Sequence, residues 1–118
     1  MVKIVLSLKK SSEFQHVLQK GKWYSGDLIS VYILPNSKDI NYFGIAVSKK
    51  TGKAVKRNRI KRVIRESYRK IAPNIIKGNN IVVVWKTKKP FDELNFCTIE
   101  KDMIKCFSKA KLMISENT

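Results

Sequence analysis

The segment Lys53–Lys70 reads KAVKRNRIKRVIRESYRK. Nine of its eighteen residues are Lys or Arg, and Glu66 is its only acidic residue. At about 100° of rotation per residue, one side of a helix through this segment collects Ile60, Val63, Ile64, Ser67, Tyr68 and Ile71. We therefore predict a helix that packs this side against the rest of the fold. It should end before Pro73, because a residue preceding proline disfavours the α conformation.

The opposite side of this helix is basic. It carries Asn58, Arg62, Arg65 and Arg69, with Arg59 and Lys70 along one edge and Lys61 along the other. Glu66 can pair with Arg62 and Lys70, but like charges also stand four residues apart, and each such pair weakens an isolated helix by roughly 0.2–0.5 kcal/mol. This repeated repulsion favours a bound polyanion over a merely solvated face. Arginine in particular can bind phosphate through two parallel hydrogen bonds.

The whole chain is strongly basic. Its 118 residues include 25 Lys or Arg against nine Asp or Glu, a formal net charge of +16. The length suits a single domain spanning residues 1–118, and a hydrophobic content of 43% allows a core without metal or disulfide staples. The charge predicts a polyanionic partner: nucleic acid, an anionic membrane or an acidic protein. We see neither an apolar run of membrane-spanning length nor a signal-peptide pattern, so we expect a cytoplasmic protein without a membrane partner.

Helices and strands are predicted on both sides of the basic helix. A capping-box pattern at Ser12 predicts a short helix ended by Gly21, and residues 23–27 are interpreted as a turn. Strands are predicted at 28–34 and 42–48, which we expect to form a hairpin, and the apolar run 81–85 predicts a central strand covered on both sides. A last amphipathic helix begins at about Cys97. This order predicts an α+β sandwich with one mixed sheet.

The expected hairpin has two different faces, because alternate residues of a strand point to opposite sides. One face collects Ile29, Val31, Ile33, Phe43, Ile45 and Val47; the other collects Ser30, Tyr32, Gly44, Ala46 and Ser48. The second face is small and polar, so it is either solvated or the floor of a groove. Aromatic residues that could stack on unpaired bases are Phe14, Trp23, Tyr24 and Tyr32, although Phe14 also fits the core. RNA with unpaired bases therefore suits the chain better than duplex DNA.

Residues for catalysis are scarce. His16 is the only histidine, and no metal-binding pattern surrounds it. Cys97 and Cys106 stand about 13 Å apart along the expected last helix, too far for a disulfide. The acids Asp92 and Glu93 suit the first turn of a helix. Neither a catalytic triad, a pair of carboxylates nor a glycine-rich phosphate loop can be assembled, which indicates a binding module.

Three strings of residues identify a family: GIAVSKK (44–50), GKAVKRNRIKR (52–62) and Arg65-Glu66. They closely resemble the protein subunit of bacterial ribonuclease P, with Arg57-Asn58-Arg59 the most diagnostic part. The resemblance implies a two-layer sandwich of three helices and one mixed, mostly antiparallel four-stranded sheet, ribosomal-protein-S5-domain-2-like. It also implies a left-handed β–α–β crossover, a hand that such connections rarely take.

The resemblance further implies a subunit of the endoribonuclease that removes the 5′ leader from precursor tRNA. Catalysis is then expected from an RNA subunit with Mg²⁺, and the protein itself carries no cofactor. Its partners would be that RNA and precursor tRNA, and no stable homo-oligomer is expected. The alternative is a ribosomal or other structural RNA-binding protein without a processing role. A DNA-binding regulator is less favoured, because Asn58 is the only amide on the basic face.

The resemblance also implies site residues, by position. Arg57, Asn58, Arg59, Lys61, Arg62 and Arg65 match the RNA-binding helix, to which we add the basic residues Lys53, Lys56 and Arg69. Phe14, Leu18, Tyr32 and Ala46 match a cleft for the single-stranded leader, to which we add Ser48 and Lys49. Leu18 departs from the family pattern, in which an aromatic residue is often found. Neither catalytic nor metal-binding residues are implied.

Overall fold

The computed structural model describes residues 7–8, 11–86 and 96–114. Helix α1 (Ser11–Lys20) precedes strands β1 (Lys22–Ser25), β2 (Ile29–Pro35) and β3 (Tyr42–Ala46); helix α2 (Ala54–Ile71) then leads to β4 (Asn79–Trp85) and helix α3 (Phe96–Lys109). Short 3-10 turns occupy Lys49–Thr51 and Ala72–Asn74. The strands form one mixed sheet in the order β1-β2-β4-β3, with the β3–β4 pair parallel. The expected α+β class, with three helices and a four-stranded mixed sheet, is confirmed.

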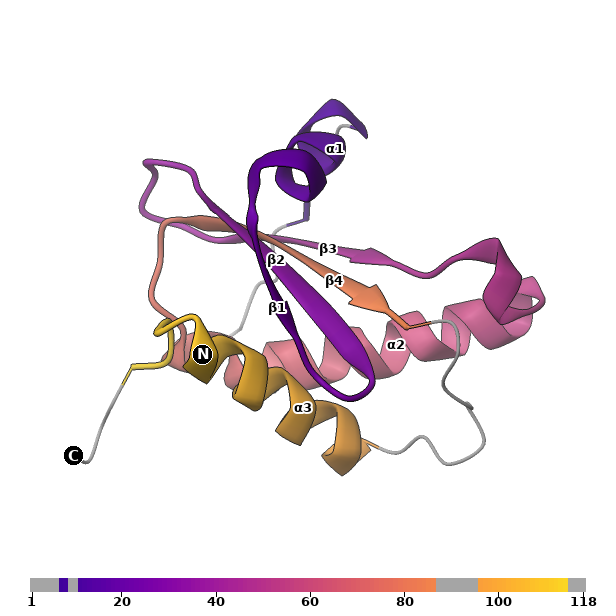
Figure 1. Ribbon diagram of the computed structural model, residues 1–118. Helices are drawn as coiled ribbons and strands as arrows, with labels where there is room; N and C mark the ends of the chain where they lie inside the picture. The colour runs from indigo at the N-terminus through magenta and orange to yellow at the C-terminus, as the bar shows by residue number, and fades with distance from the viewer. Residues whose placement is uncertain (1–6, 9–10, 87–95, 115–118) are drawn as a thin grey trace.

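Helices cover both faces of this sheet. Figure 1 shows α2 and α3 side by side below it and α1 crossing above it. Helix α2 connects two parallel neighbouring strands, as a crossover helix must. Helix α1 packs on β2 and β4. The expected helix start at Asp92 and Glu93 lies outside the described residues, as does the side chain of Cys97.

The prediction that residues 28–34 and 42–48 pair as a hairpin is wrong. Strand β4 lies between β2 and β3, with its Val83 opposite Val31 on one side and Ile45 on the other. β4 takes this central place because its side chains suit burial on both faces, and Val82 and Val83 are both completely buried. The prediction that residues 81–85 form a central, doubly covered strand is therefore confirmed, and β3 becomes an edge strand.

Two local predictions also need correction. Residues 23–25, expected to begin a turn at 23–27, instead belong to strand β1, which pairs antiparallel with β2. Its first two residues are exposed and its last two half-buried, so it lacks the alternation by which a half-buried strand is detected in a sequence. Strand β3 ends at Ala46, two residues earlier than expected, because Ser48 instead caps the following 3-10 turn by accepting a hydrogen bond from the Lys50 backbone N–H (3.1 Å).

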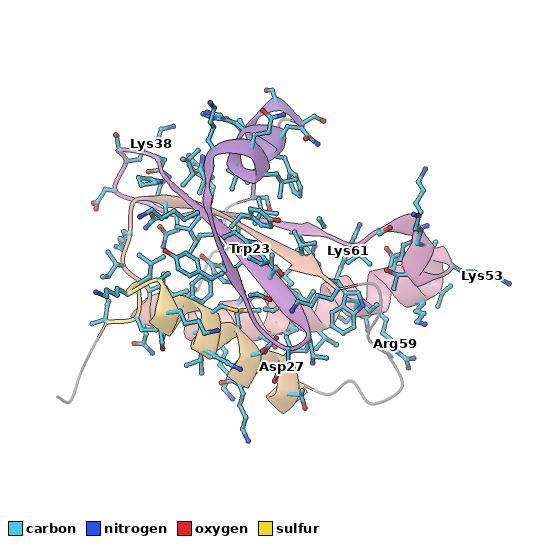
Figure 2. The ribbon with its side chains drawn as sticks, in the orientation of Figure 1. Trp23, Asp27, Lys38, Lys53, Arg59 and Lys61 are labelled. Atoms are coloured by element: carbon cyan, nitrogen blue, oxygen red, sulfur yellow. The ribbon has the colours of Figure 1, made fainter. Side chains whose placement is uncertain are left out.

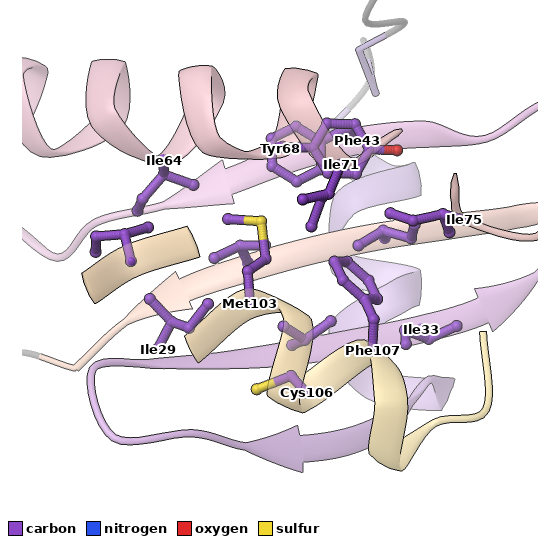
Figure 3. Close-up of a cluster of buried hydrophobic side chains, with 14 of the residues drawn as sticks. Ile29, Ile33, Phe43, Ile64, Tyr68, Ile71, Ile75, Met103, Cys106 and Phe107 are labelled. Atoms are coloured by element: carbon purple, nitrogen blue, oxygen red, sulfur yellow. The ribbon is translucent and has the colours of Figure 1, made fainter. Parts of the chain in front are cut away.

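The main core lies between the sheet and the pair α2–α3. Figure 3 shows Ile64, Tyr68 and Ile71 of α2 and Met103, Cys106 and Phe107 of α3 gathered with Ile29 and Ile33 of β2 and Phe43 of β3. Tyr68 stacks on Phe43 with ring centroids 3.8 Å apart and planes inclined by 8°. This contact joins α2 directly to the edge strand that precedes it in the chain.

Helix α3 is also joined to the β1–β2 turn by a buried carboxylate. Asp102 accepts hydrogen bonds from the backbone N–H groups of Asp27 (2.7 Å), Leu28 (2.8 Å) and Ile29 (3.0 Å). Gly26 is required beside it, because a Cβ there would overlap the Asp102 carboxylate. A residue that the sequence marks only as one acid in a helix thus holds the start of β2 in place.

Candidate nucleic-acid interface

Helix α2 divides into a buried and an exposed side, as predicted. Ile60, Ile64 and Ser67 are completely buried, and Tyr68 and Ile71 nearly so. The exposed candidates are Lys53, Asn58, Arg59, Arg62, Arg65 and Arg69, while Lys56, Arg57 and Lys61 are half-buried. Figure 2 shows Lys53 and Arg59 projecting outward from the N-terminal half of the helix. The nine candidates therefore lie on one helix, but three of them contact protein with part of their side chains.

The N-terminus of α2 has an unusual electrostatic character. A helix N-terminus carries partial positive charge and is usually accompanied by acidic or capping side chains. Here the N-cap residue Lys53 makes no side-chain cap, and the first turn contains no acid. The positive end of the helix and its basic side chains thus reinforce each other, an arrangement that favours a bound anion.

Arg57 has a structural role as well. Its Nε donates a hydrogen bond to the backbone oxygen of Gly52 (3.1 Å), which joins α2 to the preceding turn. The exposed Ser48 and Lys49 lie at the start of that turn. A guanidinium has four further N–H donors, so Arg57 can still donate hydrogen bonds to another group.

The expected pairing of Glu66 with Arg62 and Lys70 is wrong. Glu66 pairs with Arg69 at 3.1 Å, one residue closer along the helix, and Lys70 lies 3.5 Å from Glu100 of α3. Within the described residues, Arg62 and Arg65 form neither an ion pair nor a side-chain hydrogen bond. No described side chain therefore pairs with their charges.

The sheet face on which α1 lies, called the α1 face below, contains the remaining candidates. Register places its residues in three rows across the strands: Leu34, Asn80 and Tyr42; then Trp23, Tyr32, Val82 and Gly44; then Ser25, Ser30, Val84 and Ala46. The face is less polar than the sequence suggested, because the central strand β4 inserts two valines. Tyr32, Val84 and Ala46 are half-buried and remain accessible.

Helix α1 covers only part of this face. Val17 is its one completely buried residue, and Phe14 and Leu18 are half-buried. Phe14 lies directly on Gly44: a Cβ at this glycine would stand 2.7 Å from the Phe14 ring. The absence of a side chain at residue 44 thus lets α1 approach the sheet closely. The structure brings Phe14, Leu18, Tyr32 and Ala46 to one face, with Ser48 and Lys49 beyond the end of β3.

Trp23 is predicted only as one of the aromatic residues that could stack on bases, and it is absent from the predicted leader cleft, yet it lies exposed on this face. Trp23 is 58% exposed, and it is the largest of the exposed apolar side chains among the described residues. The sequence marks it as an aromatic residue in an expected turn, and this pattern gives no sign of its position beside Tyr32. The cross-strand register supplies that position.

A hollow of about 580 Å³ lies at the far end of the α1 face, where β3 begins. His16 of α1, Leu34 and Tyr42 contribute to its wall, and the Lys38 ammonium stands 5.4 Å from the centre of the Tyr42 ring. This hollow is on the side away from Ser48 and Lys49, so it is separate from the expected leader cleft.

The described residues contain no cluster of three or more His, Cys, Asp or Glu side chains that could hold a metal ion. In the same part of the chain, no helix combines the length and apolarity needed to cross a bilayer.

The family model for ribonuclease P matches residues 3–111, a span that includes α1, the whole sheet and the basic helix. The chain belongs to the ribonuclease P protein family. It is 41% identical over 109 residues to the ribonuclease P protein component of Clostridium acetobutylicum, covering 91% of this chain and 90% of that protein. The protein component of Natranaerobius thermophilus is 35% identical over 109 residues, covering 92% and 93% of the two chains.

Solved ribonuclease P proteins share the fold. The Staphylococcus aureus protein superposes with a TM-score of 0.79 at 31% identity, covering 93% of this chain and 99% of that one. The Thermotoga maritima protein gives the same TM-score at 28% identity, covering 87% and 96%. The chain is thus a protein subunit of the endoribonuclease ribonuclease P, and a purely structural RNA-binding role is not favoured.

Proposed function

We propose that this ribonuclease P protein binds the catalytic RNA subunit through the exposed side of α2 and holds the unpaired 5′ leader of precursor tRNA on the α1 face. In this proposal the chain acts as a single domain in the cytoplasm, and its partners are the RNA subunit and the precursor. The proposal rests on two surfaces that the core does not use: the exposed side of α2, where Arg62 and Arg65 are unpaired among the described residues, and the accessible α1 face. The turn Lys49–Thr51 joins the edge strand β3 of that face to α2.

The basic helix suits RNA because its charge is concentrated where the fold does not need it. Arg62 and Arg65 point away from the core and are unpaired within the described residues. Lys53 and Asn58 lie toward the N-terminus of the helix, whose dipole adds positive potential. Phosphate contacts of this kind position an RNA without reading its sequence.

The α1 face suits a single strand. Tyr32 offers a ring for an unpaired base, while Ala46 is small enough to let a backbone approach. Phe14 and Leu18 of α1 form one wall, and Lys49 at the end of the face is placed to neutralise a phosphate. Leu18 supplies aliphatic rather than aromatic surface, so stacking there is not expected.

Cleavage itself is assigned to the RNA subunit. We propose that Mg²⁺ is bound by the holoenzyme and that this chain contributes neither a ligand to the reactive metal nor an acid or base. By holding the leader, the protein favours precursor over mature tRNA and supports metal binding at the cleavage point. Its contribution is therefore to binding and positioning.

The test is cleavage of precursor tRNA by the RNA subunit at low Mg²⁺, with and without this protein. We expect stimulation by the protein, and a dissociation constant that is lower for precursor than for mature tRNA. A series of leader lengths separates the alternatives, because a structural RNA-binding protein would show an affinity independent of the leader. Absence of stimulation together with leader-independent binding would refute the proposal.

A further inference from the structure

Trp23 stands on the edge strand β1, at the end of a row that crosses the whole sheet. Its Cα partner is Tyr32 on β2, whose partner is Val82 on β4, whose partner in turn is Gly44 on β3. Since directly opposite residues of a sheet project to the same face, Trp23 lies on the α1 face. Figure 2 marks it on β1.

Helix α1 closes one half of this row and leaves the other open. Phe14 covers Gly44, and Val82 is completely buried. Tyr32 is only half-buried and Trp23 is 58% exposed. Opposite cross-strand residues have Cβ atoms about 4.5–5.5 Å apart, so the two side chains leave the sheet from neighbouring positions. The open half of the row therefore carries two accessible aromatic side chains.

The charge around this surface identifies its occupant. Lys20 and Lys22 are exposed on either side of Gly21, and the segment Lys20–Ser25 contains no acid. Lys22 projects to the face of β1 opposite Trp23, because adjacent strand residues alternate, so Lys20 at the end of α1 is the lysine on the side of the indole. An indole on a basic segment without acids fits a base joined to phosphates, because the ring offers stacking and the lysine offers charge neutralisation. An apolar partner protein would leave the Lys20 ammonium without compensation.

We propose that Trp23 extends the leader cleft beyond Tyr32, and that the two side chains together form a platform for an unpaired base of the precursor leader. This inference rests on the proposed function. Because the RNA-binding helix follows β3 and Trp23 lies on the opposite edge, about 14 Å away across three strand spacings, the base on Trp23 is farther from the cleavage point. Only a precursor with a long leader should therefore reach Trp23.

The chain provides its own optical probe. It has two tryptophans, and Trp85 is 1% exposed, so a soluble quencher such as acrylamide should reach only Trp23. We expect precursor with a long leader to protect the quenchable fluorescence and mature tRNA to leave it accessible. In Trp23→Phe the quenchable fraction should be absent, which verifies the assignment of the signal.

Affinity measurements with matched variants complete the test. Trp23→Ala should bind a long-leader precursor about 5- to 150-fold more weakly, the range for loss of one stacked base, while Trp23→Phe should remain close to wild type. Both variants should bind a precursor with a leader of one or two nucleotides as wild type does. Ile76→Ala removes another exposed apolar side chain, 44% exposed, from the loop after α2 and serves as the control.

Each other outcome has a distinct meaning. Equal binding of long leaders by Trp23→Ala and wild type, with wild type still preferring precursor, would overturn this inference and leave the proposed function intact. If wild type shows no preference for precursor, the proposed function itself fails. Protection of Trp23 that rises with the concentration of protein alone would assign the indole to a second copy of the chain, and would also overturn the inference.

Discussion

The two faces of the sheet are closed to different degrees. On the face toward α2 and α3, Ile29, Val31 and Val83 are completely buried under two long helices. On the α1 face a helix of ten residues covers the completely buried Val17 and Val82 but leaves Tyr32 and Ala46 accessible. The first face can supply most of the folding free energy, while the second keeps surface for a ligand. In the proposed function the leader therefore binds on the side of the sheet opposite the main core.

The largest expected effect is on the closed face. Phe107→Ala should lower the free energy of unfolding by about 3–5 kcal/mol, because a completely buried ring leaves a cavity. Urea unfolding measures this decrease. Phe14→Ala is the matched change on the α1 face, where the ring is half-buried, and should cost clearly less stability while weakening leader binding. Equal decreases in stability would mean that the two faces are equally closed.

The next effect tests how the closed face is joined to the β1–β2 turn. Asp102→Ala should cost on the order of 3 kcal/mol, because three backbone N–H donors are deprived of a buried charged acceptor. Asp27→Ala is the control: its exposed carboxylate lies 3.7 Å from Lys105 and should contribute less than about 1 kcal/mol. Similar unfolding curves for Asp102→Ala and wild type would show that the carboxylate does not stabilise this turn.

Alkaline pH should weaken the closed face. Burial raises the pKa of Tyr68 to about 12 from 10, and burial, with a smaller contribution from Asp102, raises the pKa of Cys106 to about 11. A group whose pKa is higher in the folded than in the unfolded state makes its full contribution to stability at pH values below its unfolded-state pKa. That contribution is lost as the pH rises through the folded-state pKa. For Tyr68 the decrease reaches about 1.4 kcal/mol by about pH 11.

Unfolding free energies of wild type and Tyr68→Phe between about pH 9 and pH 11 measure this decrease, because Cys106 and the lysines are common to both. The variant should lose less stability over this interval. A parallel decline of the two proteins would show that ionisation of Tyr68 does not oppose folding.

The smallest effect on folding is expected on the outer side of α2. Arg62→Ala and Arg65→Ala should change the unfolding free energy by less than about 0.5 kcal/mol, since both residues are exposed. Each should weaken binding to the RNA subunit and reduce the log–log salt slope by about 0.7–0.9 for every phosphate that the variant no longer neutralises. Lys101→Ala on α3 provides a control with the same change of charge. An unchanged slope would mean that these arginines touch no phosphate.

Much of the secondary structure follows from local pattern, and the errors follow from what pattern omits. The face of α2 with Ile60, Ile64 and Tyr68 is set by helical periodicity, and the central place of residues 81–85 by their continuous apolarity. Strand β1 is not predicted, because this four-residue edge strand shows no alternation of buried and exposed residues. The false hairpin arises from the assumption that neighbours in sequence pair, whereas a more apolar strand from farther along the chain fits between them.

The candidate site divides in the same way. The basic side of α2 could be predicted because one helix carries all of it. The α1 face could be predicted only in part, since residues of four strands and one helix compose it. The pairing of Glu66 with Arg69 rather than Arg62 depends on rotamers that spacing does not specify. Trp23 could be recognised as an aromatic residue, but its place beside Tyr32 required the register of β1.

The sequence by itself determined the charge, the two-sided basic helix and, through Arg57-Asn58-Arg59 and the strings around it, the family. These properties reside in contiguous residues, so rotation per residue and composition are enough to read them. Only the tertiary structure decided that β4 separates β2 from β3, that Phe14 rests on Gly44, and that Trp23 lies opposite Tyr32. Such contacts join residues distant in the chain, and burial of the central strand selects them from many pairings that local preference allows.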